Sequence, residues 1–100
     1  MRFARVHGRV FGSSSCDDGL VLMVTVEEGH QFRTVRHECI SPLPLNAQDH
    51  PLRWWADQLT QETIGTVLAL DGWEAIAEST GDTARASVDT ATVTYVIRRL

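Results

Sequence analysis

The chain has 100 residues, of which 43% are hydrophobic and 22% are charged, with a formal net charge of −4 at pH 7. This size and composition are typical of one globular domain and exclude a long disordered chain. The longest apolar run, residues 20–24, is too short to cross a bilayer, and the charged start is unlike a signal peptide. We therefore expect a single soluble, cytoplasmic domain over residues 1–100.

Residues 2–11 alternate with a period of two, which predicts a half-buried strand. The side chains expected to point inward are Ala4, Val6, Gly8 and Val10. A glycine inside a strand predicts a bulge or a sharp bend at Gly8. The small and polar residues 12–19 predict a loop after this strand.

Residues 20–28 and 31–40 predict two strands joined by a tight turn around Gly29, which makes a short hairpin. In the first of these strands, the side chains expected to point inward are Leu20, Leu22, Val24 and Val26. Two prolines within residues 41–45 end the second strand, because proline cannot donate a hydrogen bond to a ladder.

Residues 49–65 change to a helical period. Their apolar side chains form one stripe at positions i, i+3, i+4 and i+7: Leu52, Trp55, Ala56 and Leu59. Asp49 or His50 can cap the start of this helix, and Gly65 is a natural C-terminal stop.

The last third of the chain is expected to return to strands. Residues 66–70 predict a strand that ends at an Asp71–Gly72 turn, and residues 90–100 alternate as a final strand. Residues 73–79 fit either a helical turn or a strand, and residues 80–82 predict a turn.

Three strands, a helix and two or three further strands suggest the oligonucleotide/oligosaccharide-binding (OB) arrangement. We therefore predict one mainly β domain, an OB-like barrel of order β-β-β-α-β-β with a single helix. The alternative is an α+β fold, in which one helix packs across an open antiparallel sheet.

All nine basic residues are arginine, which suggests a GC-rich bacterial or phage genome. Residues 1–40 hold five arginines and five acidic residues, whereas residues 41–100 hold four arginines and eight acidic residues. An anion-binding face is therefore expected in the first part of the chain. The net charge of −4 disfavours non-specific binding to nucleic acid.

The outward side of the first strand interleaves aromatic and basic residues: Phe3, Arg5, His7, Arg9 and Phe11. Aromatic rings can stack on bases and guanidinium groups can bind phosphates, so this side is a candidate nucleic-acid surface that Arg33 or Arg36 could extend. The same side could instead contact a protein, face solvent, or pair with Glu27 and Glu38 across strands.

Two cysteines and two histidines are the right residue types for zinc, but Cys16, His30, His37 and Cys39 lack the short paired spacing of known zinc motifs. Neither cysteine has the sequence surroundings of a catalytic nucleophile. In a cytoplasmic chain we expect both thiols to stay reduced. No metal or other cofactor is predicted, and the sequence leaves metal binding by these four residues open.

The run "TVRHECISPLPL", followed by a helix and "GTVLAL", resembles the staphylococcal-nuclease-like branch of the OB fold. The resemblance places Arg36 at the position of that family's strand arginine. The metal-binding aspartate falls on Ser41, however, and the water-activating glutamate falls near Leu43 or Leu45. Cleavage by that mechanism needs carboxylates that hold a cation, so the resemblance implies an OB fold without nuclease activity.

We therefore expect a non-enzymatic binding module. The first hypothesis is a small acidic protein-interaction protein, such as an inhibitor, adaptor or assembly subunit of a bacterium, phage or mobile element. Arg53, Trp54 and the acidic second half of the chain would then form the contact, since tryptophan and arginine are enriched in interface hot spots. The alternative is a protein that binds single-stranded nucleic acid through the first strand and Arg36. The oligomeric state is not predicted.

Overall fold

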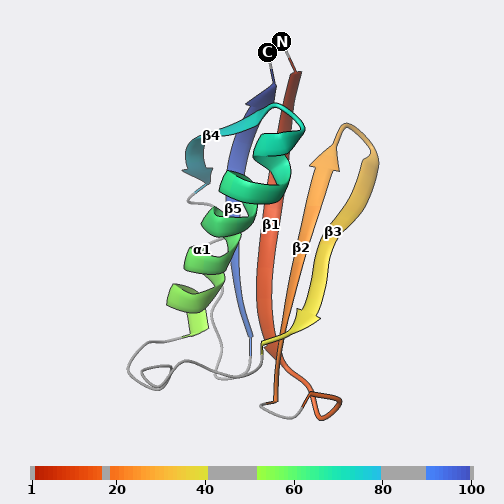
Figure 1. Ribbon diagram of the computed structural model, residues 1–100, viewed down its shortest axis with the longest axis vertical. Coiled ribbons are helices and arrows are strands. Elements are labelled where there is room, and N and C mark those ends of the chain that lie inside the picture. The colour runs from red at the N-terminus through yellow and green to blue at the C-terminus, as the bar shows by residue number, and fades with distance from the viewer. Residues whose placement is uncertain (1, 17–18, 41–51, 80–89, 100) are drawn as a thin grey trace.

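The computed structural model describes residues 2–16, 19–40, 52–79 and 90–99, with the side chains of all of these except residues 77–79. The elements follow one another along the chain (Figure 1): β1 (Arg2–Gly12), β2 (Leu20–Glu28), β3 (Gln31–Cys39), α1 (Leu52–Thr63), the π-helix η2 (Ile64–Leu68), β4 (Trp73–Ser79) and β5 (Thr90–Arg99).

The five strands form one antiparallel sheet in the order β3-β2-β1-β5-β4. The helix α1 lies across one face of this sheet, over β1 and β5 (Figure 1). The prediction of a mainly β fold with one helix is confirmed. The outer strands β3 and β4 do not pair in the described part of the chain, so a closed OB-like barrel is not confirmed. The described sheet has the open arrangement of the alternative prediction.

The sheet buries the alternate side chains that the sequence pattern places inward. Val6, Leu22 and Val24 are fully buried on the α1 side of β1 and β2. Val93 and Ile97 of β5 are also fully buried, and they continue this layer beside β1. Removing apolar surface from water in this layer is the main favourable term in folding.

The predicted stripe on the helix is confirmed. Trp55 and Ala56 are buried against the sheet, and Leu52 and Leu59 pack at the edge of the same core. The predicted capping residues, Asp49 and His50, lie outside the described residues, as does the turn predicted at residues 80–82.

The prediction that Gly65 ends the helix and that residues 66–70 form a strand is wrong. The helix instead continues through η2, which begins at Ile64, and then to residue 70. Ile64 and Leu68 are both buried, so this short apolar run joins the core at helical spacing. The strand begins only at Trp73, which resolves the two possibilities for residues 73–79 in favour of β4.

The bulge predicted as one possibility at Gly8 is absent, and the bend predicted as the other stays a prediction. The pairing register of β1 continues without a shift on both sides of Gly8. The turns predicted at Gly29 and at Gly72 are present, and both glycines have a positive φ, at 63° and 86°. Glycine adopts this left-handed conformation without a steric cost.

Cys16 and Cys39 form a disulfide, with an S–S distance of 2.07 Å and a Cα–Cα distance of 5.6 Å. The expectation that both thiols stay reduced is therefore wrong. The bond ties the β1–β2 loop to the last residue of the outer strand β3. Sequence spacing could not reveal this pairing, because the β2–β3 hairpin brings Cys39 beside Val21, close to that loop.

Candidate functional site

The sheet has a second face, opposite α1, that no described helix covers. All five residues predicted on the outward side of β1 lie on it: Phe3, Arg5, His7, Arg9 and Phe11. We call this surface the open face. The strand register adds Glu27 of β2, Phe32 of β3 and Val96 of β5.

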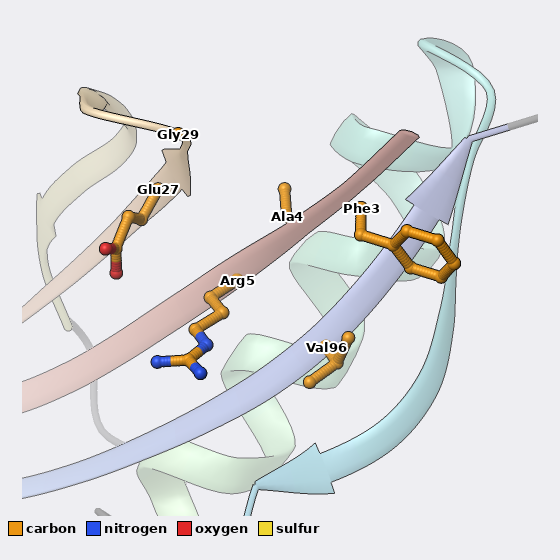
Figure 2. A pocket seen from close by; sticks show the side chains of 6 residues that line it. All are labelled: Phe3, Ala4, Arg5, Glu27, Gly29 and Val96. Atoms are coloured by element: carbon orange, nitrogen blue, oxygen red, sulfur yellow. The ribbon is translucent and has the colours of Figure 1, made fainter. Parts of the chain in front are cut away.

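One row of side chains crosses the open face near the β2–β3 turn. Arg5 lies between Glu27 and Val96, and Glu27 lies between Arg5 and Phe32. Figure 2 shows Arg5, Glu27, Val96 and Phe3 on the side of the sheet away from the helix. These side chains, with Ala4 and Gly29, surround a shallow hollow of about 400 Å³. The hollow combines a cation, a carboxylate and apolar walls.

His7 is held by two neighbours on the open face. Its Nε2 lies 2.8 Å from Glu27 Oε1, and its Nδ1 lies 3.0 Å from Thr94 Oγ1. A carboxylate can only accept, so Nε2 carries a proton and donates it to Glu27. His7 therefore has a structural part in this surface, since it fixes the carboxylate that borders the hollow.

Arg5 and Arg9 have no carboxylate partner in the described part of the chain. Arg9 stacks over the ring of Phe11 instead, with 4.8 Å between the guanidinium carbon and the ring centroid. Four other described arginines lie within 4.0 Å of a carboxylate oxygen: Arg2, Arg33, Arg36 and Arg98. Two cations with no ion-pair partner among the described side chains thus share one strand, about 13 Å apart along it at the usual rise per residue.

Two large aromatic residues are exposed on the open face, at the Arg5 end of β1. Phe3 is 54% exposed and Phe32 is 67% exposed. The sequence pattern does not predict Phe32 as a site residue. The predicted strand over residues 31–40 puts Phe32 and Arg33 on opposite faces of the sheet. Which face Phe32 occupies depends on its pairing with Glu27.

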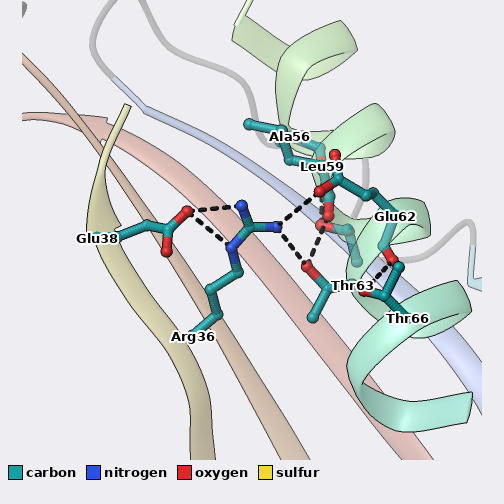
Figure 3. Close-up of polar contacts among 8 residues, drawn as sticks. Arg36, Glu38, Ala56, Leu59, Glu62, Thr63 and Thr66 are labelled. Atoms are coloured by element: carbon teal, nitrogen blue, oxygen red, sulfur yellow. Dashed lines mark hydrogen bonds and ion pairs between the residues drawn. The ribbon is translucent and has the colours of Figure 1, made fainter. Parts of the chain in front are cut away.

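Arg36 lies on the other side of the sheet from the open face. Figure 3 shows its guanidinium between β3 and α1. It donates two hydrogen bonds to Glu38 Oε1, at 2.9 and 2.6 Å, and one to Thr63 Oγ1 at 3.1 Å. Glu62 Oε1 lies 3.6 Å away. The hydrogen bonds to Glu38, together with the charges of Glu38 and Glu62, raise the pKa of Arg36. Arg36 therefore links an outer strand to the helix and does not extend the patch on β1.

Arg53 and Trp54 are also separate from the open face. Both lie at the start of α1, on the opposite side of the sheet. Arg53 is exposed, whereas Trp54 is half-buried and packs edge-on against Trp55, with 4.8 Å between the ring centroids. The eight residues predicted to bind a partner therefore occupy three places, and only the five on β1 form a continuous surface.

The described residues contain no group of three or more His, Cys, Asp and Glu side chains placed to hold a metal ion. The disulfide also removes Cys16 and Cys39 as thiolate ligands or nucleophiles in the oxidised protein. No described helix is long and apolar enough to span a bilayer.

No known protein-family model matches the chain, and no curated protein or solved structure matches it either. The expected resemblance to nuclease-like OB proteins thus gains no support from known proteins. The open face has to be interpreted from its own chemistry.

Proposed function

We propose that this protein is a non-enzymatic binding module that contacts an acidic surface of another protein through its open face. The observation that carries the proposal is the pair of cations Arg5 and Arg9, which have no carboxylate partner among the described residues and share one face with the exposed rings of Phe3 and Phe32. Arginine and aromatic residues are the types enriched where proteins contact one another.

The position of β1 supports this proposal. This strand lies at the centre of the sheet and is hydrogen-bonded on both sides, to β2 and to β5. Its side chains are therefore held on a rigid support, which lowers the entropy lost on binding. The guanidinium groups of Arg5 and Arg9 can each form a bidentate pair with a carboxylate of the partner.

Single-stranded nucleic acid is the second candidate partner, because the same exposed rings could stack on bases and the same cations could bind phosphates. Arg5 and Arg9, which have no carboxylate partner in the described ranges, offer few positive charges on a chain of net charge −4, and this favours the protein partner. Neither candidate requires a closed OB-like barrel.

The disulfide bears on where the protein works. A cytoplasmic location was expected together with reduced cysteines, and the Cys16–Cys39 bond removes that premise. Disulfides persist in oxidising compartments and are rare in the cytosol. The proposal therefore places the partner in an oxidising compartment.

Site-specific photocrosslinking tests the proposal. A photoreactive phenylalanine analogue replaces Phe32 on the open face or, as a matched control, Gln58, which is exposed on the helix. In the native host we expect discrete, nuclease-resistant adducts with an acidic protein from position 32 only. The Arg5→Glu/Arg9→Glu variant should lose them, because the reversed charges repel a carboxylate surface.

The remaining outcomes discriminate between the candidates. Adducts from position 32 that disappear on nuclease treatment would favour single-stranded nucleic acid over protein. Adducts that persist in the charge-reversed variant, or that form equally from position 58, would overturn the open face as the binding surface.

A further inference from the structure

A second concave region lies on the α1 side of the sheet, between the end of the helix and β4. This groove has a volume of about 450 Å³. Ile64, Gly65 and Ala69 form its helical wall, and Trp73 and Ala75 form its strand wall. These walls are mainly apolar, with a buried indole at their base, and Glu74, Gln61 and Tyr95 complete the lining.

The groove exists because small residues face it. A Cβ atom added to Gly65 would meet no atom within 4 Å, so the space above this residue is open. Ile64 and Gly65 also belong to η2, which has π-helical geometry. Such segments are rare and frequently occur at functional sites. The π-helical segment therefore borders the open space of the groove.

One end of the groove is polar. Gln61 Nε2 donates to Asp57 Oδ2 and to the Tyr95 hydroxyl, both at 2.9 Å, and Tyr95 donates to Asp57 Oδ1. The amide nitrogen must face Asp57, since a carboxylate only accepts. Both amide hydrogens are thereby used, and Gln61 Oε1 is left to accept a hydrogen bond.

We propose that this groove binds a small, neutral, largely apolar molecule that carries one hydrogen-bond donor, such as a hydroxyl or N–H group. Ligand pockets usually measure roughly 300–1,000 Å³ and combine apolar walls with a few convergent polar groups. The apolar body would lie between Gly65 and Trp73, with its donor on Gln61 Oε1. The Asp57 carboxylate, which is hydrogen-bonded to the lining residues Gln61 and Tyr95, disfavours an anionic ligand nearby.

The strand register puts Trp73 and Ala75 of the groove on the α1 side of the sheet and Arg5 on the other side, so this inference does not depend on the proposed protein partner.

Binding of N-phenyl-1-naphthylamine, a neutral apolar fluorophore with a single N–H group, tests the proposal. We expect a saturable rise in its fluorescence on titration with the oxidised full-length chain. Amide chemical shifts of Gly65, Ala69 and Ala75 should change with the same saturation curve. Non-saturable binding, or shift changes confined to other parts of the chain, would overturn the proposal.

A groove-filling variant and a matched control separate specific binding from adhesion to any apolar surface. Gly65→Leu places a side chain in the open space and should weaken probe binding by at least about tenfold. Gln58→Leu adds the same side chain at an exposed helical position outside the groove and should leave binding unchanged.

The filling variant should fold, because leucine has a higher helix propensity than glycine. Its circular dichroism and urea midpoint report this independently of the probe. Unchanged probe affinity in a folded Gly65→Leu variant would contradict the proposed site.

Discussion

Gly8 lies in the middle of β1, directly under Thr60 of the helix. A Cβ atom at this position would lie 1.6 Å from Thr60 Oγ1 and 2.8 Å from Thr60 Cβ. Thr60 is fully buried and donates its hydroxyl hydrogen to the carbonyl oxygen of Ala56. The glycine therefore allows the helix to approach the sheet closely.

The first prediction concerns this contact. Gly8→Ala should lower the free energy of unfolding by about 1–3 kcal/mol or more, because the new methyl group overlaps Thr60. Adding Thr60→Ala should restore only part of the loss, since Cβ of residue 60 remains too close. Gly65→Ala is the control: it enters open space in a helix and should stabilise by about 0.5–1 kcal/mol. Urea denaturation measures all three, and a neutral Gly8→Ala would contradict the close contact.

The second prediction concerns the charge pair of Arg2 and Glu28. Arg2 donates two hydrogen bonds to this carboxylate, at 2.8 and 2.6 Å, and its guanidinium lies 5.6 Å from the ring centroid of Trp73. The hydrogen bonds from Arg2 are the largest cause of a lowered pKa at Glu28. The resulting stabilisation is fully present above the pKa of the unfolded chain, and it is lost as pH falls through the lowered folded value.

NMR titration of the Glu28 carboxyl checks this effect. In Arg2→Gln the pKa should rise towards the usual range of a glutamate. Arg5→Gln is the matched control, since Arg5 lies on the opposite face and should leave Glu28 unaffected. An unchanged pKa in Arg2→Gln would mean that the carboxylate is stabilised by other groups.

At the scale of elements, the strands and the helix follow from local periodicity, whereas their extent does not. Alternation marked β1, β2 and β5, and the spacing of Trp55 and Ala56 marked the helix. The pattern of residues 66–70 predicts a strand, although a short apolar segment fits either structure. Burial of both Ile64 and Leu68 decided in favour of the helix, and that burial depends on tertiary packing.

The third prediction concerns the disulfide, which joins two segments that are distant in the sequence. Cys16 and Cys39 are 23 residues apart, and closing a loop of this length should stabilise the fold by about 3 kcal/mol. Cys16→Ser/Cys39→Ser should lower the urea midpoint accordingly. A reducing agent should have the same effect on the native chain and none on the double variant. Equal midpoints with and without the bond would contradict this stabilising role.

At the scale of the whole molecule, the sequence indicated two faces of the sheet but not the order of the strands. The hairpin of β2 and β3 was predictable, since a short turn joins them. The pairing of β1 with β5, from opposite ends of the chain, was not. The candidate site shows the same division. The alternation of β1 is enough to put five site residues on one face. The register of β3 decides the other two positions: Arg36 lies on the opposite face, and Phe32 lies on the same face as the five.

The fourth prediction follows from these two faces. Leu22 is fully buried on the α1 side, so Leu22→Ala should cost about 2–5 kcal/mol of unfolding free energy. Phe32 is 67% exposed on the open face, so Phe32→Thr, which keeps a good strand former, should change stability by less than about 0.5 kcal/mol. Urea denaturation of the oxidised proteins compares the two variants.

The comparison also tests the basis of the proposed function. A large apolar side chain that is exposed and contributes little to folding remains available to a partner. If Phe32→Thr destabilised the fold as much as Leu22→Ala, Phe32 would have to be covered by the chain itself. The open face would then belong to the core of the protein, and Arg5 and Arg9 would lose the exposed aromatic surface that makes a protein contact the favoured interpretation.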